Sequence, residues 1–325
     1  MKKNILIILL LIGQIVFSQK IYKKTHYNLM GSFFEFAVVA SSEQEGAFFI
    51  AEALKEVMRI EDLLSSWRDY TQTSAVNKNA GIAPVKVDRE LFDLIKRCNH
   101  ISKMTDGAFD ISFESIDKIW YFDKKMEKIP DSLTIRKSIE KINYKNIILD
   151  EGNRTVFLKE KGMKIGFGGI GQGYGAEKVK EKLIKMGVVS GLINASGDIT
   201  TWGDHPENKT WKIAIKNPDH SKNDIAWFNI HNSSVSTSGN YENYIIINGV
   251  RHGHTIDPKT GWPSKGLQSV TVFCDNLELS DALDTAVFVM GVKKGLSFVN
   301  QLKGVECLLL DDNNELFYSN GLKNK

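Results

Sequence analysis

Apolar residues recur at helical spacing in several stretches of the chain. In the first they are Ile50, Leu54, Val57 and Leu64, and the next stripe comprises Leu91, Leu94, Ile95, Cys98 and Ile101. This spacing predicts amphipathic helices, the second capped by Asp88 and ended by the turn at 105–107. A third helix follows the glycine-rich residues 166–175 and ends at Gly187. We expect a fourth between Ser280 and Gly291 and a last one over 292–302.

Short apolar runs bounded by turn residues predict strands. Residues 32–40 form one such run, 146–150 and 155–159 read as a hairpin around 151–153, and the polar residues 68–81 read as a loop. Further runs lie at 191–195, 211–216, 227–231, 243–248, 250–256, 268–274, 306–310 and 315–319. We expect 243–248 to turn at Asn248-Gly249 into 250–256, and the last two runs to form a terminal hairpin around 311–314. Strand-rich stretches between a few helices, without a repeated βαβ array, predict an α+β fold. We expect a single two-lobed domain with mixed or antiparallel sheets and flanking helices.

Composition supports a globular domain. The chain has 325 residues, of which 42 % are hydrophobic and 25 % are charged, so a sizeable core can form. Its formal net charge of +3 gives no indication of a nucleic-acid partner. With six prolines there is no proline-rich linker.

The N-terminal residues have the pattern of a secretory signal peptide. Lys2 and Lys3 precede an apolar run over residues 5–17, which is short for a membrane span, and polar residues 18–20 follow. We expect cleavage near Ser18 or Gln19, so that residues 1–19 are the signal peptide and 20–325 the functional domain of an exported, periplasmic or otherwise extracytoplasmic protein. An uncleaved anchor is the alternative. No cysteine follows the apolar run, so we expect no N-terminal lipidation.

The three cysteines, Cys98, Cys274 and Cys307, lie far apart in apolar surroundings. Their odd number and their settings predict buried free thiols rather than a disulfide framework or a metal cluster.

The glycine-rich segment matches a dinucleotide-binding spacing. Gly166 to Gly171 satisfy G-x-G-x-x-G. A Rossmann turn needs an acidic residue about 20 positions further on, whereas Glu177 and Glu181 fall inside the predicted helix and Asp198 follows the next strand. The downstream hairpins also disagree with a doubly wound sheet. Glycines here allow close approach of the backbone to a ligand or to a facing element, and tight packing alone is the alternative.

Other side chains could carry chemistry. His254 ends a predicted strand, where it could act as a base on a hydroxyl or only bond to a nearby carbonyl. Asp281 and Thr285 are four residues apart and so share a helix face that would suit Mg²⁺, with Asp284 beside them. Asp281 could equally serve as a favourable charge in a first helical turn. Trp67 could stack on a flat ligand or cover the core.

Taken together, several motifs resemble those of the bacterial FAD:protein FMN transferases, the ApbE-type flavin transferases. They are Met30-Gly31, the segment with Trp67, Ser74 and Asn77, T-D-G-A-F-D at 105–110, G-G-I-G-Q-G at 168–173, T-S-G-N-Y-E at 237–242, H-T-I-D-P-K-T-G at 254–261 and S-D-A-L-D-T-A at 280–286. The resemblance covers nearly the whole chain after the predicted signal peptide.

The resemblance implies an exported, Mg²⁺-dependent enzyme with FAD as substrate. Such an enzyme attaches FMN through a phosphoester to a Thr or Ser of an exported acceptor flavoprotein, such as a membrane redox subunit, and releases AMP. It also implies a cofactor cleft between two lobes. Asp281, Thr285 and the carbonyl of Gly171 match the metal ligands, with Asp284 as a further candidate, and His254 matches the catalytic histidine.

The resemblance also assigns residues to the FAD pocket, and these are Met30, Trp67, Ala108, Phe109, Asp110, Gln172, Thr237, Ser238 and Ile256. The chain departs from the family pattern at Gly166, where the family often has Asp, at Gln172, where it often has Lys, and at Ser196, where Gly is common. An FAD pyrophosphatase yielding FMN and AMP, a non-catalytic FAD-binding protein and, more distantly, an NAD-dependent oxidoreductase are the alternatives.

Overall fold

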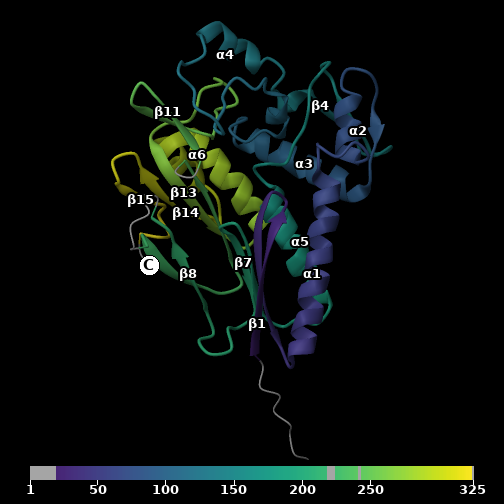
Figure 1. Ribbon diagram of the computed structural model, residues 1–325, viewed down its shortest axis with the longest axis vertical. Coiled ribbons are helices and arrows are strands. Elements are labelled where there is room, and N and C mark those ends of the chain that lie inside the picture. Colours follow the sequence, from purple (N-terminus) through teal and green to yellow (C-terminus); the bar gives the residue numbers. More distant parts are fainter. Residues whose placement is uncertain (1–19, 218–223, 241–242, 324–325) are drawn as a thin grey trace, which may run out of the picture.

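The computed structural model describes residues 20–217, 224–240 and 243–323. Its main feature is an eight-stranded sheet in the order β1-β2-β6-β7-β10-β13-β14-β15, in which every neighbouring pair is antiparallel (Figure 1). The strands are β1 Lys20–Leu29, β2 Ser32–Ala40, β6 Gly191–Ala195, β7 Asp198–Trp202, β10 Ser234–Gly239, β13 Leu267–Cys274, β14 Glu306–Asp311 and β15 Leu316–Tyr318. The predicted α+β class is confirmed.

Long helices pack on the sheet, namely α1 Glu43–Leu64, α5 Gly171–Lys185 and α6 Leu277–Val299 (Figure 1). Successive side chains of a strand point to opposite faces. Phe34, Phe36 and Val38 of β2 therefore enter the core formed with α1 and α5, whereas Ala37 packs in another cluster. That second cluster includes the hairpin of β8 Trp211–Ile215 and β9 Ala226–Ile230, so both faces of the sheet are covered.

A further group of elements, made of α3 and several short helices and strands, gathers near the upper end of the molecule as drawn in Figure 1. They are α2 Gln72–Lys78, β3 Val85–Lys86, α3 Arg89–Met104, the 3₁₀ turn η1 Ile111–Ser115, α4 Ser132–Ser138, the 3₁₀ turn η2 Tyr144–Asn146, β4 Ile147–Asp150, β5 Thr155–Leu158, β11 Tyr244–Ile247 and β12 Val250–Gly253. β3, β5 and β4 form one small sheet, and β11 and β12 form a hairpin.

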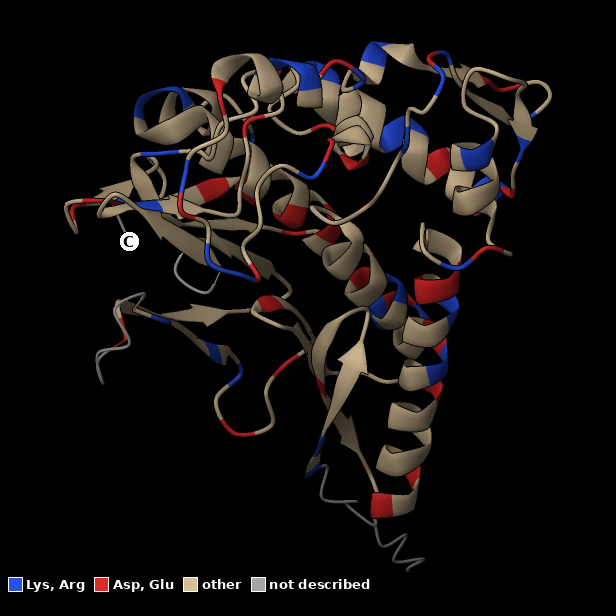
Figure 2. Ribbon diagram, turned by 45° about the horizontal axis from the view of Figure 1, so that its top comes forward, with Lys and Arg blue, Asp and Glu red and all other residues tan. Residues whose placement is uncertain are grey.

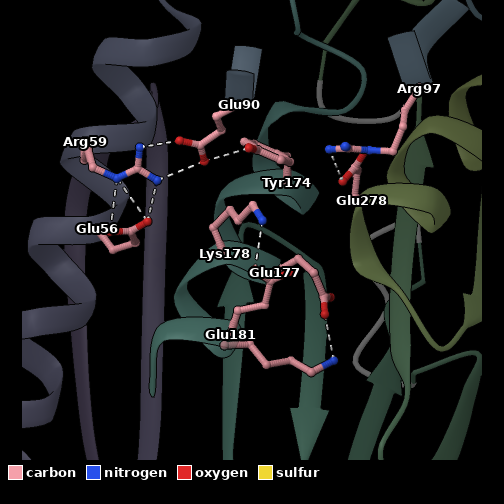
Figure 3. Close-up of polar contacts among 10 residues, drawn as sticks. Glu56, Arg59, Glu90, Arg97, Tyr174, Glu177, Lys178, Glu181 and Glu278 are labelled. Atoms are coloured by element: carbon pink, nitrogen blue, oxygen red, sulfur yellow. Dashed lines mark hydrogen bonds and ion pairs between the residues drawn. The ribbon is translucent and has the colours of Figure 1, made fainter. Parts of the chain in front are cut away.

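A hydrogen bond and ion pairs with exposed arginines tie α3 to the long helices (Figure 3). Tyr174 of α5 donates to Glu90 of α3 at 2.8 Å, and Arg59 of α1 binds the same carboxylate at 2.6 Å. Arg97 of α3 donates twice to Glu278 of α6, at 2.6 and 3.0 Å. These bonds fix α5 and α6 relative to each other through α3, and both helices carry candidate site residues.

Several predicted elements are confirmed and others need correction. The helices at 43–64 and 89–104 and the hairpins at 147–158, 244–253 and 306–318 form, and the three cysteines are buried free thiols. The prediction of a loop over 68–81 was wrong, because Thr71 caps α2 there by accepting the N–H of Ser74. Asp88 precedes α3, but its carboxylate accepts from Gln72 instead of capping the helix.

The last long helix also begins earlier than predicted. Asn276 caps α6 by accepting the N–H of Leu279, so Ser280 lies inside the helix and donates to the carbonyl of Asn276. Gly291, with φ 74°, interrupts the helix at the predicted boundary, and the chain continues helically to Val299. Strands β1, β7 and β10 were not predicted.

Charges of both signs are spread over the helices, and acidic and basic segments alternate along α1 (Figure 2). Among the described residues, no helix combines the length and the apolar character needed to cross a membrane. The predicted signal peptide, residues 1–19, lies outside the described residues.

Candidate active site

A cavity of about 860 Å³ opens where the end of the main sheet meets the smaller elements. Its walls come from segments far apart in sequence, which are the β1–β2 turn, residues 108–114, the glycine-rich segment 166–172, the ends of β7 and β10, residues 254–258 and the middle of α6. The cavity is large enough for a dinucleotide and is lined by both apolar and polar groups.

Carboxylates cluster at one part of this cavity. Asp198 begins β7, and Asp281 and Asp284 lie one helical turn apart on α6. They are 9 %, 6 % and 1 % exposed. Burial raises the pKa of Asp198 to about 6, and burial together with the charges of its neighbours raises the pKa of Asp281 and of Asp284 well above the usual value.

Ser236 of β10 joins two of these carboxylates. Its Oγ contacts Asp198 Oδ1 and lies 2.5 Å from Asp284 Oδ2. A hydroxyl has one hydrogen, so both contacts can be hydrogen bonds only if one carboxyl group also carries a proton. Among the described residues, no Lys or Arg forms an ion pair with any of the three carboxylates. The cluster therefore needs either a proton or a bound cation to offset its charge.

The glycine-rich segment packs against the same part of α6. The N–H of Gly173 donates to Asp281 Oδ2 at 2.8 Å, and a Cβ at Gly173 would lie 2.4 Å from the carbonyl oxygen of Leu277. A Cβ at Gly169 would lie 3.2 Å from Thr285 Oγ1. Glycine at these positions lets the start of α5 touch α6, so the tight packing considered from the sequence is confirmed, and Gly169 also lines the cavity.

The donor set fits a hard cation such as Mg²⁺, because it offers carboxylate, hydroxyl and backbone oxygens. In the part of the chain that the structure describes, no three His, Cys, Asp or Glu side chains form a metal site by themselves. A cation held by Asp281 would therefore also need oxygens from Thr285 or the backbone. Gly171, the predicted carbonyl ligand, is buried as the first residue of α5, between cavity-lining Gly169 and Gln172.

His254 follows β12 and lines the cavity. Its ring Nδ1 lies 3.2 Å from the carbonyl oxygen of Asn243, and the backbone N–H of His254 donates to the same oxygen at 3.0 Å. The neutral tautomer with hydrogen on Nδ1 donates to this carbonyl and leaves Nε2 as the acceptor. Phe122 packs edge-on against the ring, with centroids 6.4 Å apart. The imidazole is thus oriented as a proton acceptor would need to be.

Most of the residues predicted to contact FAD line the cavity, and these are Ala108, Phe109, Asp110, Gln172, Thr237, Ser238 and Ile256. Asp110 is buried, accepts from Ser112 and from the N–H of Tyr144, and so holds the 105–110 turn in place. Ser238 donates to Asp284 at 2.9 Å. Gln172 donates to Ser32 Oγ at 3.1 Å, which links α5 to the β1–β2 turn.

Two predicted contacts lie elsewhere. Trp67 is 86 % exposed and is not part of the cavity wall, although its neighbour Ser66 reaches cavity-lining Glu114 at 3.4 Å. Met30, in the β1–β2 turn with φ 48°, is half-buried and packs on the start of α5, where its Cε would lie 3.6 Å from a Cβ at Gly171. The structure brings neither side chain into the cavity.

Sequence reasoning missed residues that the fold brings to this site. Asp198 was considered only as an acid too distant for a Rossmann turn, and Ser236 and Glu114 were not considered. Asp198 directly follows the tight turn at Ser196 and Gly197, which have φ 55° and 108°. The sequence did offer one signal for Asp198, which was a carboxylate directly after a two-residue hairpin turn. The positive φ at Ser196 also explains why glycine is common there in the resembled family.

The fold and the cavity define an α+β protein with an oxygen-rich acidic site and a nearby histidine. The chain belongs to the ApbE family, whose model matches residues 30–309. It is 32 % identical over 265 residues to an FAD:protein FMN transferase of Klebsiella pneumoniae, covering 81 % of this chain and 82 % of that one. A protein of the same name from Treponema pallidum is 30 % identical, with 79 % and 76 % covered.

Solved structures agree with this assignment. The ApbE protein of Thermotoga maritima has a TM-score of 0.84 and 28 % identity, with 94 % of this chain and 99 % of that chain covered. The flavinyl transferase ApbE of Pseudomonas stutzeri has a TM-score of 0.82 and covers 95 % and 98 %, and at 24 % identity it supports the fold alone. Together these similarities disfavour the NAD-dependent alternative.

Proposed function

We propose that this protein transfers FMN from FAD to a Thr or Ser hydroxyl of an acceptor protein and releases AMP. Relatives that are 30 and 32 % identical over most of their length are named FAD:protein FMN transferases. The observation that carries the proposal is that one cavity contains His254, the Asp281 and Asp284 carboxylates and the Thr285 hydroxyl. A bound cation and a residue that accepts or orients the attacking hydroxyl recur in sites that transfer phosphoryl groups to hydroxyls.

The residues have separate tasks in this reaction. Nε2 of His254 accepts the proton of the acceptor hydroxyl, while the bond from Nδ1 to the carbonyl of Asn243 keeps the ring oriented. The hydroxyl oxygen forms a bond to the phosphorus of the FMN half, the bond from that phosphorus to the oxygen of AMP breaks, and AMP leaves. No redox change occurs.

We assign Mg²⁺ to Asp281, Thr285 and the carbonyl of Gly171, with Asp284 in support. When bound, Mg²⁺ neutralises negative charge on the pyrophosphate. Ala108, Phe109 and Ile256 offer apolar surface to the rings of FAD. Gln172 keeps a hydrogen-bonding group at a position where the family often has a cation.

We further propose that the protein works outside the cytoplasm on an exported flavoprotein. The charged, apolar and polar regions of residues 1–20 support export, since this order is typical of a signal peptide. The absence of a cysteine after the apolar run supports a form without an N-terminal lipid.

The test is to incubate the full-length protein with FAD and MgCl₂, with and without a purified extracytoplasmic flavoprotein domain. Chromatography measures AMP and FMN, and in-gel fluorescence after denaturation detects covalent flavin on the acceptor. AMP together with a fluorescent acceptor supports the proposal. If AMP and free FMN form and no candidate acceptor is labelled, the protein is an FAD pyrophosphatase. If FAD binds and no AMP forms, it is a non-catalytic binding protein.

A histidine variant sharpens this test. His254→Ala should lose AMP release while FAD binding persists, because the side chain acts on the acceptor hydroxyl. His100→Ala is the matched control, since His100 is exposed on α3 and is not part of the cavity wall. Equal loss in both variants would contradict the role of His254.

A further inference from the structure

Glu114 is a cavity-lining carboxylate that the proposed reaction has not used. It lies in η1, is half-buried, and faces the cavity beside Phe113 and Gly166. Within the described residues its carboxylate receives a single hydrogen bond, a long one of 3.4 Å from Ser66 Oγ. Burial raises the pKa of Glu114, and Ser66 and the charge of Lys164 partly oppose this. A half-buried carboxylate with so few donors can accept more hydrogen bonds.

The position of Glu114 is fixed by backbone contacts on both sides. Ser115 Oγ accepts the N–H of Lys164 at 2.7 Å and donates to its carbonyl at 2.8 Å. The N–H of Gly166 donates to the carbonyl of Ile111 at 2.9 Å. η1 and residues 164–166 are therefore held together as one unit, which keeps the backbone of Glu114 beside Gly166.

Gly166 lacks a side chain where Glu114 lies. A Cβ at Gly166 would be 2.7 Å from Glu114 Oε2 and 3.0 Å from its Cβ and Cδ. Gly166 does not have a positive φ, so its backbone would accept any L residue. The first atoms that a side chain at position 166 would meet are therefore those of the Glu114 side chain, which would have to shift to make room for it.

We infer that Glu114 supplies, from a different segment, the carboxylate that an aspartate at position 166 would supply, and that it binds a hydroxyl or N–H donor of the nucleotide. A Cβ at position 166 would lie 2.7 Å from Glu114 Oε2. The carboxylate oxygens of an aspartate there would lie two bonds from that Cβ, and so could reach the region that Glu114 Oε2 occupies. A carboxylate repels phosphate, so its partner is an uncharged donor on the adenosine or riboflavin half. The inference rests on the proposed function only in naming FAD.

The test measures FAD binding to the full-length protein by quenching of flavin fluorescence, without any acceptor protein. Glu114→Gln keeps the shape of the side chain and removes its charge, and Glu114→Ala removes the carboxylate. Each should weaken FAD binding about 10- to 100-fold, the range expected for a hydrogen bond to a charged group. Gly166→Asp alone should also weaken binding, because two carboxylates would compete for one space.

The combined variant Glu114→Ala with Gly166→Asp should recover binding to within a few fold of the wild type, because the carboxylate returns from the other segment. Glu160→Ala, an exposed glutamate near the same loop, is the matched control and should bind as the wild type does. Circular dichroism and thermal unfolding verify that each variant is folded. Direct quenching of FMN fluorescence, and displacement of bound FAD by ADP, identify which half of FAD donates.

The outcomes separate this inference from the proposed function. If the wild type fails to bind FAD, both are overturned. If the wild type binds FAD and folded Glu114→Gln and Glu114→Ala bind it equally well, Glu114 is not a binding residue, although the proposed function stands. Failure of the folded double variant to bind better than Glu114→Ala would overturn the exchange between positions 114 and 166.

Discussion

Replacing Asp198 with asparagine should stabilise the protein near neutral pH when no divalent cation is present. Asp198 is buried beside Asp281 and Asp284, and its carboxylate contacts Ser236 Oγ. Asparagine has nearly the same shape, and its amide nitrogen can donate to the serine hydroxyl or to a carboxylate. The substitution therefore removes one of three buried ionisable carboxyl groups without opening a cavity.

The magnitude follows from the pKa of Asp198, which burial raises from 3.8 to about 6. Each tenfold change in proton affinity is worth about 1.4 kcal/mol, so ionising Asp198 costs about 3 kcal/mol more in the folded protein than in the unfolded chain. The folded state binds the proton of Asp198 more tightly than the unfolded chain does. The contribution of this protonated carboxyl group to the free energy of unfolding is therefore full below about pH 4 and is lost as the pH rises through about 6. The asparagine variant has no such loss.

At about pH 7.5 the variant should therefore be more stable by about 3 kcal/mol, which raises Tm by several degrees in a chain of this length. Calorimetry in EDTA between about pH 5 and pH 8 measures the difference, which should shrink as the pH falls. Asp123→Asn is the control, because the side chain of Asp123 is 69 % exposed. A Tm for Asp198→Asn at or below that of the wild type near neutral pH would refute the reasoning.

Other predictions follow from the same geometry. Asp281→Ala should abolish AMP release and the rise in Tm on adding MgCl₂ while the fold persists; unchanged AMP release would contradict the metal assignment. Gly173→Ala should destabilise the protein by about 1–3 kcal/mol, because its Cβ would meet the carbonyl of Leu277 at 2.4 Å, whereas Gly168→Ala, with no atom within 4 Å, should unfold as the wild type does. The three buried cysteines should not react with Ellman's reagent until the protein unfolds, and rapid reaction of a native thiol would show that one is accessible.

Local patterns predicted much of the fold. The stripes at residues 50–64 and 91–101 became α1 and α3, and the turn at Asn248-Gly249 joined β11 to β12. These elements are specified by spacings of a few residues. Strand β1 was missed because its polar, mostly exposed sequence carries no apolar run, and β10 was missed because Val235 is the one large apolar residue in a segment of serine, threonine and glycine. Both strands form because neighbouring strands supply their hydrogen bonds.

The candidate site shows the same division. Asp281 and Thr285 could be paired from sequence, because residues four apart share one helix face whatever surrounds the helix. Ser236 contacts both Asp198 and Asp284, which are 38 and 48 positions away, and these contacts depend on the register of β10 against β7 and on the packing of α6. Trp67 shows the opposite. The family resemblance assigned it to the FAD pocket, but the order of the motifs could not indicate that its side chain would be exposed.

The sequence by itself therefore determined the α+β class, most of the helices, the short hairpins and the motif residues His254, Asp281 and Thr285, because each is encoded over a turn or two of chain. Only the tertiary structure decided that Asp198 and Ser236 complete an acidic cluster and that Glu114 fills the space beside Gly166. Those relations depend on which distant segments pack together, and packing is set by the whole core at once rather than by any local spacing.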